Sequence, residues 1–252
     1  MTLNSAIAFI IGSLSSAALA AGAGWLLKNH FLVLISEARR RRQELSSGLY
    51  GVEESWADLV RFSGSYGKRL KRQYDKSKSA TWYFITTDPH GFAPWLGRES
   101  EPRSVAYKVR NSDISVVWVF HQAEAYLLQR RMLVVNAPED GVTYDAGTDL
   151  LRNACATCND RWEVLSSAVP HFYLAFLSVP STAQQSGERA PNGTFGFVLP
   201  YLLAPRSYAA RAGLYFESSS DSSNQFLLDF YYRSITDFVR LGIEQGWLNK
   251  VN

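Results

Sequence analysis

The chain has little of the residues that usually build metal or disulfide sites, with two cysteines and four histidines among its 252 residues. Cys155 and Cys158 form one CxxC pattern, whereas a zinc site needs two further ligands, and the nearest candidate, His171, stands alone. A redox pair normally lies at the start of a helix that follows a strand, but these cysteines fall within a helix-spaced apolar row. We therefore predict no metal and no bound cofactor.

Motifs of the common enzyme classes are also missing. The sequence contains no GxGxxG, no GxxxxGK[ST], no GxSxG and no HExxH pattern. This absence counts only modestly against catalysis, because some enzymes assemble their sites from distant loops. No internal repeat occurs, and the first 27 residues carry no charge of either sign.

That uncharged beginning contains one long apolar run. As a helix, residues 6–27 would be about 33 Å long, enough for a hydrocarbon core of about 30 Å. Trp25 lies near one end, where an indole favours the headgroup boundary. We predict a single transmembrane helix within an anchor segment that comprises residues 1–45.

Basic residues flank this span on one side only. No lysine or arginine precedes it, and Lys28, Arg39, Arg40, Arg41 and Arg42 follow it. The positive-inside rule then places the N-terminus outside and the C-terminal domain in the cytoplasm, which indicates a single-pass protein of the cell inner membrane. We expect the four consecutive arginines to contact lipid headgroups.

Charged residues are distributed unevenly along the rest of the chain. Residues 28–78 carry 12 Lys and Arg against 6 Asp and Glu, whereas residues 79–252 carry 14 against 17. A basic segment beside an apolar helix favours attraction to anionic lipids. The mildly acidic remainder gives no direct nucleic-acid signal, because such proteins normally show a basic face of their own.

A cleaved signal peptide is the rival interpretation of the N-terminus. Residues 18–20 offer an A-x-A cleavage site, but the first five residues lack a positive charge and the apolar run continues past the site. If the chain were exported, a Cys155–Cys158 disulfide and glycosylation at Asn192 would become relevant, because both modifications occur in exported proteins. Within the cytoplasm, Asn192 and Gly193 indicate a turn.

Small residues recur at every fourth position of the span. They are Ala8, Gly12, Ser16, Ala20 and Gly24. This spacing puts them on one stripe of the helix, where a second helix can approach closely. We expect self-association through this transmembrane packing stripe.

The remaining chain predicts one layered domain. Residues 46–79 read as a basic connector that buries little, and residues 80–252 as a cytoplasmic α/β or α+β domain. Aromatic and β-branched runs predict strands over 81–87, 171–179, 194–203 and 213–218, with a short one over 132–135 and an ambiguous run over 114–120. We expect a mixed sheet of about five strands.

Helical spacing appears in three segments. Residues 122–131 and the row between residues 145 and 168 read as helices, the latter from Leu150 to Leu165. A long C-terminal helix is predicted to begin near Ser222 or Ser223 and to end at Gly246. Its predicted apolar face comprises Leu227, Phe230, Tyr231, Phe238 and Leu241.

One candidate catalytic site follows the first predicted strand. Asp88 and His90 come directly after residues 81–87, and His121 follows the apolar run 114–120. Where strands are parallel, such positions meet at the edge where ligands bind, and Asp88 could orient an imidazole for acid–base chemistry. The alternative is an ordinary turn, since Asp-Pro initiates turns and Gly91 fits one.

These observations favour a membrane-tethered binding or signalling module over an enzyme. The head would sense a ligand or a protein partner and act at the lipid bilayer, as a bacterial stress or antiviral effector would. The alternative is a membrane-anchored hydrolase that uses Asp88, His90 and His121.

Overall fold

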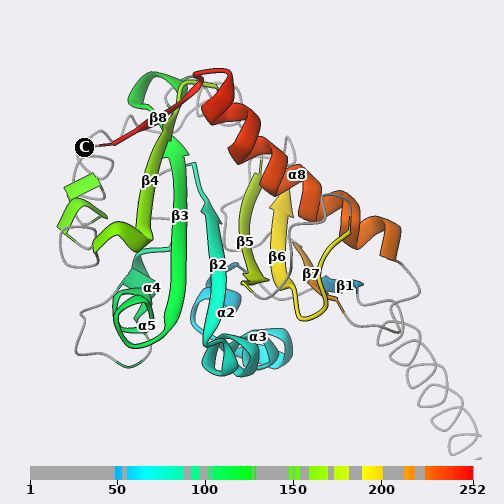
Figure 1. The fold of residues 1–252 in the computed structure, drawn as a ribbon. Coiled ribbons are helices and arrows are strands. Elements are labelled where there is room, and N and C mark those ends of the chain that lie inside the picture. Colours follow the sequence, from blue (N-terminus) through cyan, green and yellow to red (C-terminus); the bar gives the residue numbers. More distant parts are fainter. Residues whose placement is uncertain are drawn as a thin grey trace, which may run out of the picture. The chain divides into compact units, whose positions relative to one another are not determined.

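The described part of the chain contains β-strands and α-helices (Figure 1). The computed structural model describes residues 49–52, 56–87, 92–96, 102, 104–126, 128, 148–149, 151–153, 159–169, 173–181, 189–200, 213–218 and 225–251. Its strands are β1 (Leu49–Val52), β2 (Ser79–Ile85), β3 (Asp113–His121), β4 (Trp162–Ser167), β5 (Tyr173–Pro180), β6 (Phe195–Pro200), β7 (Gly213–Glu217) and β8 (Leu248–Lys250). Its helices are α2 (Trp56–Val60), α3 (Gly64–Lys76), α4 (Ala93–Leu96), α5 (Val105–Asn111), the 3-10 turn η1 (Asn159–Arg161) and α8 (Gln225–Glu244).

The eight described strands form one mixed sheet in the order β1-β7-β6-β5-β2-β3-β4-β8. Strands β2, β3 and β4 are parallel, and β8 pairs with β4 in the antiparallel sense. On the other side of β2, strands β5, β6, β7 and β1 continue the sheet with antiparallel pairs. The carboxyl ends of the three parallel strands therefore meet at one edge of the sheet.

The prediction of a mixed α/β domain with a C-terminal helix is confirmed, but about five strands was too few. The short edge strands β1 and β8 were not predicted, and β4 was expected to be helical. Trp162 and Leu165 fit a helical row by spacing, yet in β4 they face opposite sides of the sheet. Pairing on both sides, with β3 and β8, outweighs the local helical pattern.

Alternating side chains give the sheet two apolar faces, each with its own hydrophobic core. On one face, Trp82, Phe84 and Trp118 pack with residues of α2, α3, α4 and α5. On the other, Ile85 and Val119 pack with residues of α8. Figure 1 shows that α8 crosses one side of the sheet. Helices α2 to α5 lie apart from α8, near the lower end of the sheet in this view. The result is three layers, helix, sheet and helix.

The first face is unusually aromatic. Phe84 stacks on Trp118 with ring centroids 4.6 Å apart, and Tyr74 of α3 stacks on Trp82 at the same separation. The buried indole of Trp82 donates to Ser178 Oγ at 3.1 Å, and that of Trp95 donates to the Val60 carbonyl. The Tyr74–Trp82 stack joins α3 to the central strand β2, and the Trp95–Val60 hydrogen bond joins α4 to α2.

The predicted connector over 46–79 contributes to this core, so the expectation that it buries little is wrong. Leu59 of α2 and Leu70 and Tyr74 of α3 are completely buried. A Cβ on Gly67 would lie 2.9 Å from the Asp58 carbonyl oxygen, which shows how closely α2 and α3 approach. The polarity of this segment belongs to the outer side of α3, which the linear composition does not separate from the inner side.

The buried face of α8 matches the predicted one only in part, because Tyr231 and Phe238 pack against the core as predicted. Leu228, Tyr232, Ile235 and Val239 face the sheet, whereas Phe230 is 54% exposed and Leu241 is 40% exposed. The helix ends as predicted near Gly246, whose φ of 75° is readily adopted by glycine. Gly246 N donates to Ile243 O and Trp247 N to Gly242 O, the pair of bonds that defines a Schellman ending.

Among the described helices, none combines the length and the apolarity needed to cross a bilayer. The predicted span over 6–27, its packing stripe and Arg39 to Arg42 lie outside the described residues. The chain divides into two units, Met1–Ser46 and Ser47–Asn252, and every described residue belongs to the second.

Candidate functional site at the carboxyl edge of the parallel strands

Three buried polar side chains form a row at the carboxyl edge. Thr87, His121 and Ser167 are each completely buried. His121 lies opposite Ser167 in the β3–β4 register, and His121 N donates to the Thr87 carbonyl at 3.4 Å. Ser167 Oγ donates to Val169 O at 2.7 Å, which holds the end of β4. The run 114–120, which the sequence left open between strand and helix, lies in β3, and His121 is the last residue of that strand.

His121 is a neutral imidazole at physiological pH. Burial disfavours the charged form and lowers the pKa of His121 to about 4. By strand alternation its side chain lies on the same side as Val119, the side that α8 covers. Because no part of it reaches solvent, this imidazole touches no dissolved substrate in this conformation. Asp88 and His90 lie outside the described residues.

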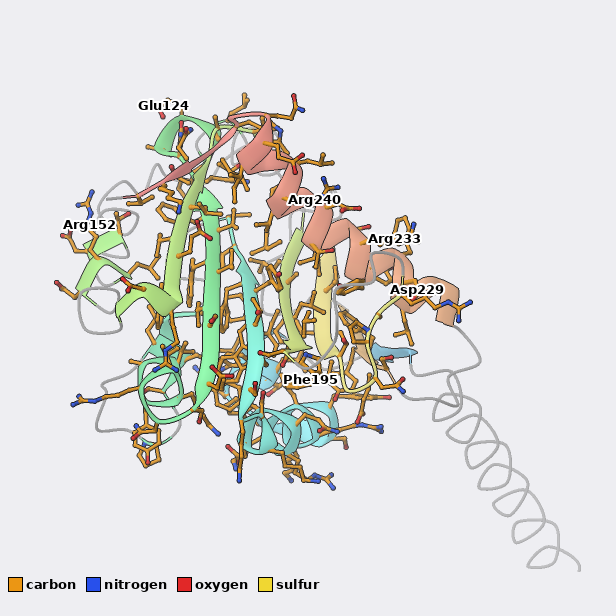
Figure 2. All side chains as sticks on the ribbon, in the orientation of Figure 1. Glu124, Arg152, Phe195, Asp229, Arg233 and Arg240 are labelled. Carbon is orange, nitrogen blue, oxygen red and sulfur yellow. The ribbon has the colours of Figure 1, made fainter. Side chains whose placement is uncertain are left out.

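A cleft of about 460 Å³ opens at the same edge, on the opposite side of the sheet. We call it the carboxyl-edge cleft. Its described lining is Phe120, Gln122, Ala123, Glu124, Thr148, Asp149, Arg152, Ser166 and Val251. Phe120 and Ser166 alternate with His121 and Ser167, so the cleft and the buried row use opposite faces of β3 and β4. Figure 2 shows Glu124 in the segment after β3 and Arg152 beside β4.

The lining of the carboxyl-edge cleft is polar and carries charge of both signs. Asp149 and Arg152 form an ion pair at 3.6 Å, with both side chains more than half exposed. Gln122 Nε2 donates to Ser166 Oγ at 3.5 Å, and Ser166 Oγ donates to Asn249 O at 3.4 Å. Carboxylates, an amide and a guanidinium offer acceptors and donors to a polar ligand.

A nucleophile with its base is not found in the described lining. That lining holds no histidine, cysteine or lysine. Ser166 contacts an amide and a backbone carbonyl in the bonds given above, and neither group removes its proton. The cleft is therefore equipped to hold a ligand, and among the contacts given above none pairs a nucleophile of its described lining with a base.

A second hollow, of about 720 Å³, lies between α8 and strands β2 and β5. Tyr83 and Tyr232 contribute to its wall, and burial, followed by Tyr232 and Glu163, raises the pKa of Tyr83. Arg240 at its rim contacts Asp237 at 3.0 Å and Glu244 at 3.1 Å, so its charge is already compensated. This hollow lies away from the carboxyl ends of the parallel strands, where ligands bind in open α/β sheets.

The described residues hold no group of three or more His, Cys, Asp and Glu side chains arranged for a metal ion. Cys155 and Cys158 lie outside them. The predicted turn at Asn192 is confirmed, because Thr194 N donates to Pro191 O at 3.0 Å and Gly193 has a φ of 86°. Asn192 and Gly193 therefore serve to form a turn.

Sequence reasoning missed the cleft residues. Gln122 and Glu124 lie within four residues of the end of the 114–120 run, so the rule that pointed to His121 could also have pointed to them. Asp149 and Arg152 carry no such signal, since only the tertiary fold brings the 148–153 segment beside the end of β3.

Comparison with known proteins gives little further guidance. No family model matches the chain, and no curated protein matches it. A solved structure of TrmBL2, described as an archaeal chromatin protein with a novel mode of DNA binding, is similar at a TM-score of 0.38 and 9% identity. The match covers 84% of this chain and 63% of that one. A likeness this distant carries no argument about function.

Proposed function

We propose that this chain is a membrane-tethered sensor whose cytoplasmic head binds a small polar ligand in the carboxyl-edge cleft. The apolar run 6–27 and the arginines that follow it support the tether and its orientation. The small-residue stripe supports assembly within the bilayer, which would couple ligand binding to an effector response.

The observation that carries this proposal is the position and composition of the cleft. Its volume of about 460 Å³ is within the ordinary range for small-molecule sites. It lies beyond the carboxyl ends of β3 and β4, the usual ligand-binding edge of an open sheet with parallel strands. Phe120 adds an apolar side chain to its lining, and Gln122 and Arg152 add polar groups that can form hydrogen bonds.

Burial of His121 favours binding over the alternative of an Asp/His hydrolase. A general base must come within hydrogen-bond reach of the proton that it removes. His121 is enclosed on the α8 side of the sheet, whereas the cleft opens on the other side. The hydrolase alternative would need that imidazole to be exposed to substrate.

Thermal unfolding with a ligand panel tests the binding proposal. The full-length protein in lipid nanodiscs is heated with nucleotides, amino acids and sugars, and the Tm is recorded for each compound. We expect at least one compound to raise the Tm, because a ligand that binds only the folded state stabilises it. Gln122→Leu and Arg152→Ala should each abolish that rise.

Arg233→Ala is the matched control, since it removes an exposed arginine from α8, outside the cleft. It should keep the full ligand effect. A panel in which no compound shifts the wild-type Tm contradicts the proposal, as does a shift that survives both cleft substitutions. Turnover of a compound that is lost in His121→Asn would favour the hydrolase instead.

A further inference from the structure

Helix α3 has one buried side and one basic side. Gly67, Leu70 and Tyr74 are buried against the sheet. Lys68, Arg72 and Lys76 are exposed, and their spacing of four residues puts them in one line along the helix. We call these three residues the α3 basic row.

Neighbouring cations on α3 are compensated within the fold, whereas the row is not. Arg69 forms an ion pair with Glu217 of β7 at 2.6 Å, and Lys71 pairs with Asp75. Within the described part of the chain, no carboxylate forms an ion pair with a member of the row. Its three positive charges are therefore available to an external anion.

The row and the carboxyl-edge cleft lie at opposite ends of the parallel strands. Helix α3 ends at Lys76 and the chain enters β2 at Ser79, so α3 lies at the amino end of that strand. The cleft lies beyond the carboxyl ends of β3 and β4. In Figure 1, α3 is at the bottom of the sheet and β8 is at the top. A surface that holds α3 would leave the cleft open to solvent.

We infer that the α3 basic row rests on the anionic headgroups of the bilayer and directs the carboxyl-edge cleft away from the membrane. This inference depends on the proposed membrane tether, which would keep α3 near lipid at high effective concentration. A polybasic face beside a membrane-spanning segment is attracted to anionic lipids.

A membrane fits this row better than a nucleic acid does. The row is a single line on one helix, and residues 79–252 carry more acidic than basic side chains, 17 against 14. Nucleic-acid surfaces normally combine a broad basic patch with groups that read bases. A planar array of lipid phosphates requires only the accessible positive charge.

An environment-sensitive label tests the inferred orientation. Both native cysteines are replaced with serine, and an NBD fluorophore is placed on Ser65→Cys, an exposed position of α3, or on Asp149→Cys at the cleft. The full-length protein is reconstituted in vesicles of phosphatidylcholine, with or without phosphatidylglycerol. We expect the Ser65 label to brighten at least twofold when phosphatidylglycerol is present, and the Asp149 label to stay unchanged.

Substitution of the row should remove this response. Lys68→Gln/Arg72→Gln/Lys76→Gln should abolish the brightening, and so should about 0.5 M salt, because screening shortens the reach of surface charge. The control Arg233→Gln/Arg240→Gln/Lys250→Gln loses the same charge from surfaces outside α3 and the cleft and should keep the brightening. Equal loss in both triple variants would reduce the effect to net charge and overturn the inference.

Flotation with neutral vesicles separates this inference from the proposed function. A chain that fails to float with phosphatidylcholine vesicles has no tether, and the proposed function fails with it. A chain that floats but whose Ser65 label ignores phosphatidylglycerol overturns the orientation alone. A Ser65 label that responds to duplex DNA at physiological salt, and not to vesicles, assigns the row to nucleic acid and also overturns the inference.

Discussion

The burial of the His121 imidazole makes the stability of the α/β domain depend on pH. The pKa of His121 is lowered from 6.5 to about 4 in the folded protein, because burial disfavours the imidazolium. Between these values the unfolded chain binds a proton that the folded chain does not, so stability falls as the pH falls through this window. We expect His121 to account for roughly 2–3 kcal/mol of stability lost between pH 7 and pH 4.5.

His121→Asn removes this titration while keeping a polar side chain. Its free energy of unfolding should fall less between pH 7 and pH 4.5 than that of the wild type, measured by urea unfolding of detergent-extracted protein. Comparing the two proteins cancels the carboxylates that titrate in the same range. An identical fall in both proteins would contradict the assignment to His121.

Substitution of Gly196 tests how closely strands β5 and β6 approach each other at this position. A Cβ at this position of β6 would lie 2.1 Å from the Phe176 carbonyl oxygen of β5, a distance that no side chain can adopt. Gly196→Ala should therefore destabilise the head by about 2–4 kcal/mol. Gly246→Ala is the control, since nothing lies within 4 Å of its Cβ and only its φ of 75° opposes alanine.

The control should cost about 1–2 kcal/mol. Both free energies come from the same urea titrations. Equal costs for the two substitutions would show that the β5–β6 approach is looser than the structure has it.

At the scale of elements, one ionic contact attaches α3 to the sheet. Arg69 binds Glu217 at 2.6 Å and lies over the ring of Tyr215, with its guanidinium carbon 5.8 Å from the centroid. Gln73 donates to the other oxygen of Glu217. Both members of the ion pair are less than a third exposed, so solvent screens it incompletely.

A double-mutant cycle with Arg69→Ala and Glu217→Ala should give a coupling energy of about 1–2 kcal/mol. The corresponding cycle for Arg240 and Glu244 on α8 should give a smaller coupling energy, because that pair is half exposed. A coupling near zero for Arg69 and Glu217 would mean that apolar packing alone holds α3.

Strong local patterns were sufficient to predict most of the central sheet. The runs that became β2, β3, β5, β6 and β7 are rich in aromatic and β-branched residues, which fit a half-buried strand. Short edge strands such as LNK in β8 carry no such pattern, because pairing with β4 alone makes them strands. The face of α8 was predicted only in part, because Phe230 and Leu241 are apolar yet exposed, whereas Tyr231 and Phe238 pack against the core.

The candidate site was predictable only in part, because its geometry depends on tertiary structure. A polar residue after an apolar run is visible in sequence, and where strands are parallel this rule points to the carboxyl edge, where His121 lies. Which side of the sheet a residue faces depends on strand register, and register is a tertiary property. Hence the sequence could not distinguish the buried His121 from the cleft residues Gln122 and Glu124.

At the scale of the whole molecule, the proposed anchor, the α3 basic row and the carboxyl-edge cleft are consistent with one proposed orientation at the membrane. Residues 28–78 carry 12 Lys and Arg against 6 Asp and Glu, while residues 79–252 carry a net charge of −3. The positive-inside rule retains such a basic segment in the cytoplasm. The ligand that the head senses would then be a cytoplasmic molecule.

Protease protection tests this central claim most directly. Full-length protein with a C-terminal epitope is expressed in a bacterium, and protease is added to sealed spheroplasts and to permeabilised ones. We expect the C-terminal domain to sediment with membranes, to survive in sealed spheroplasts and to be digested only after permeabilisation. Digestion in sealed spheroplasts, or recovery of the intact chain in the soluble fraction, would contradict a cytoplasmic head tethered by residues 6–27.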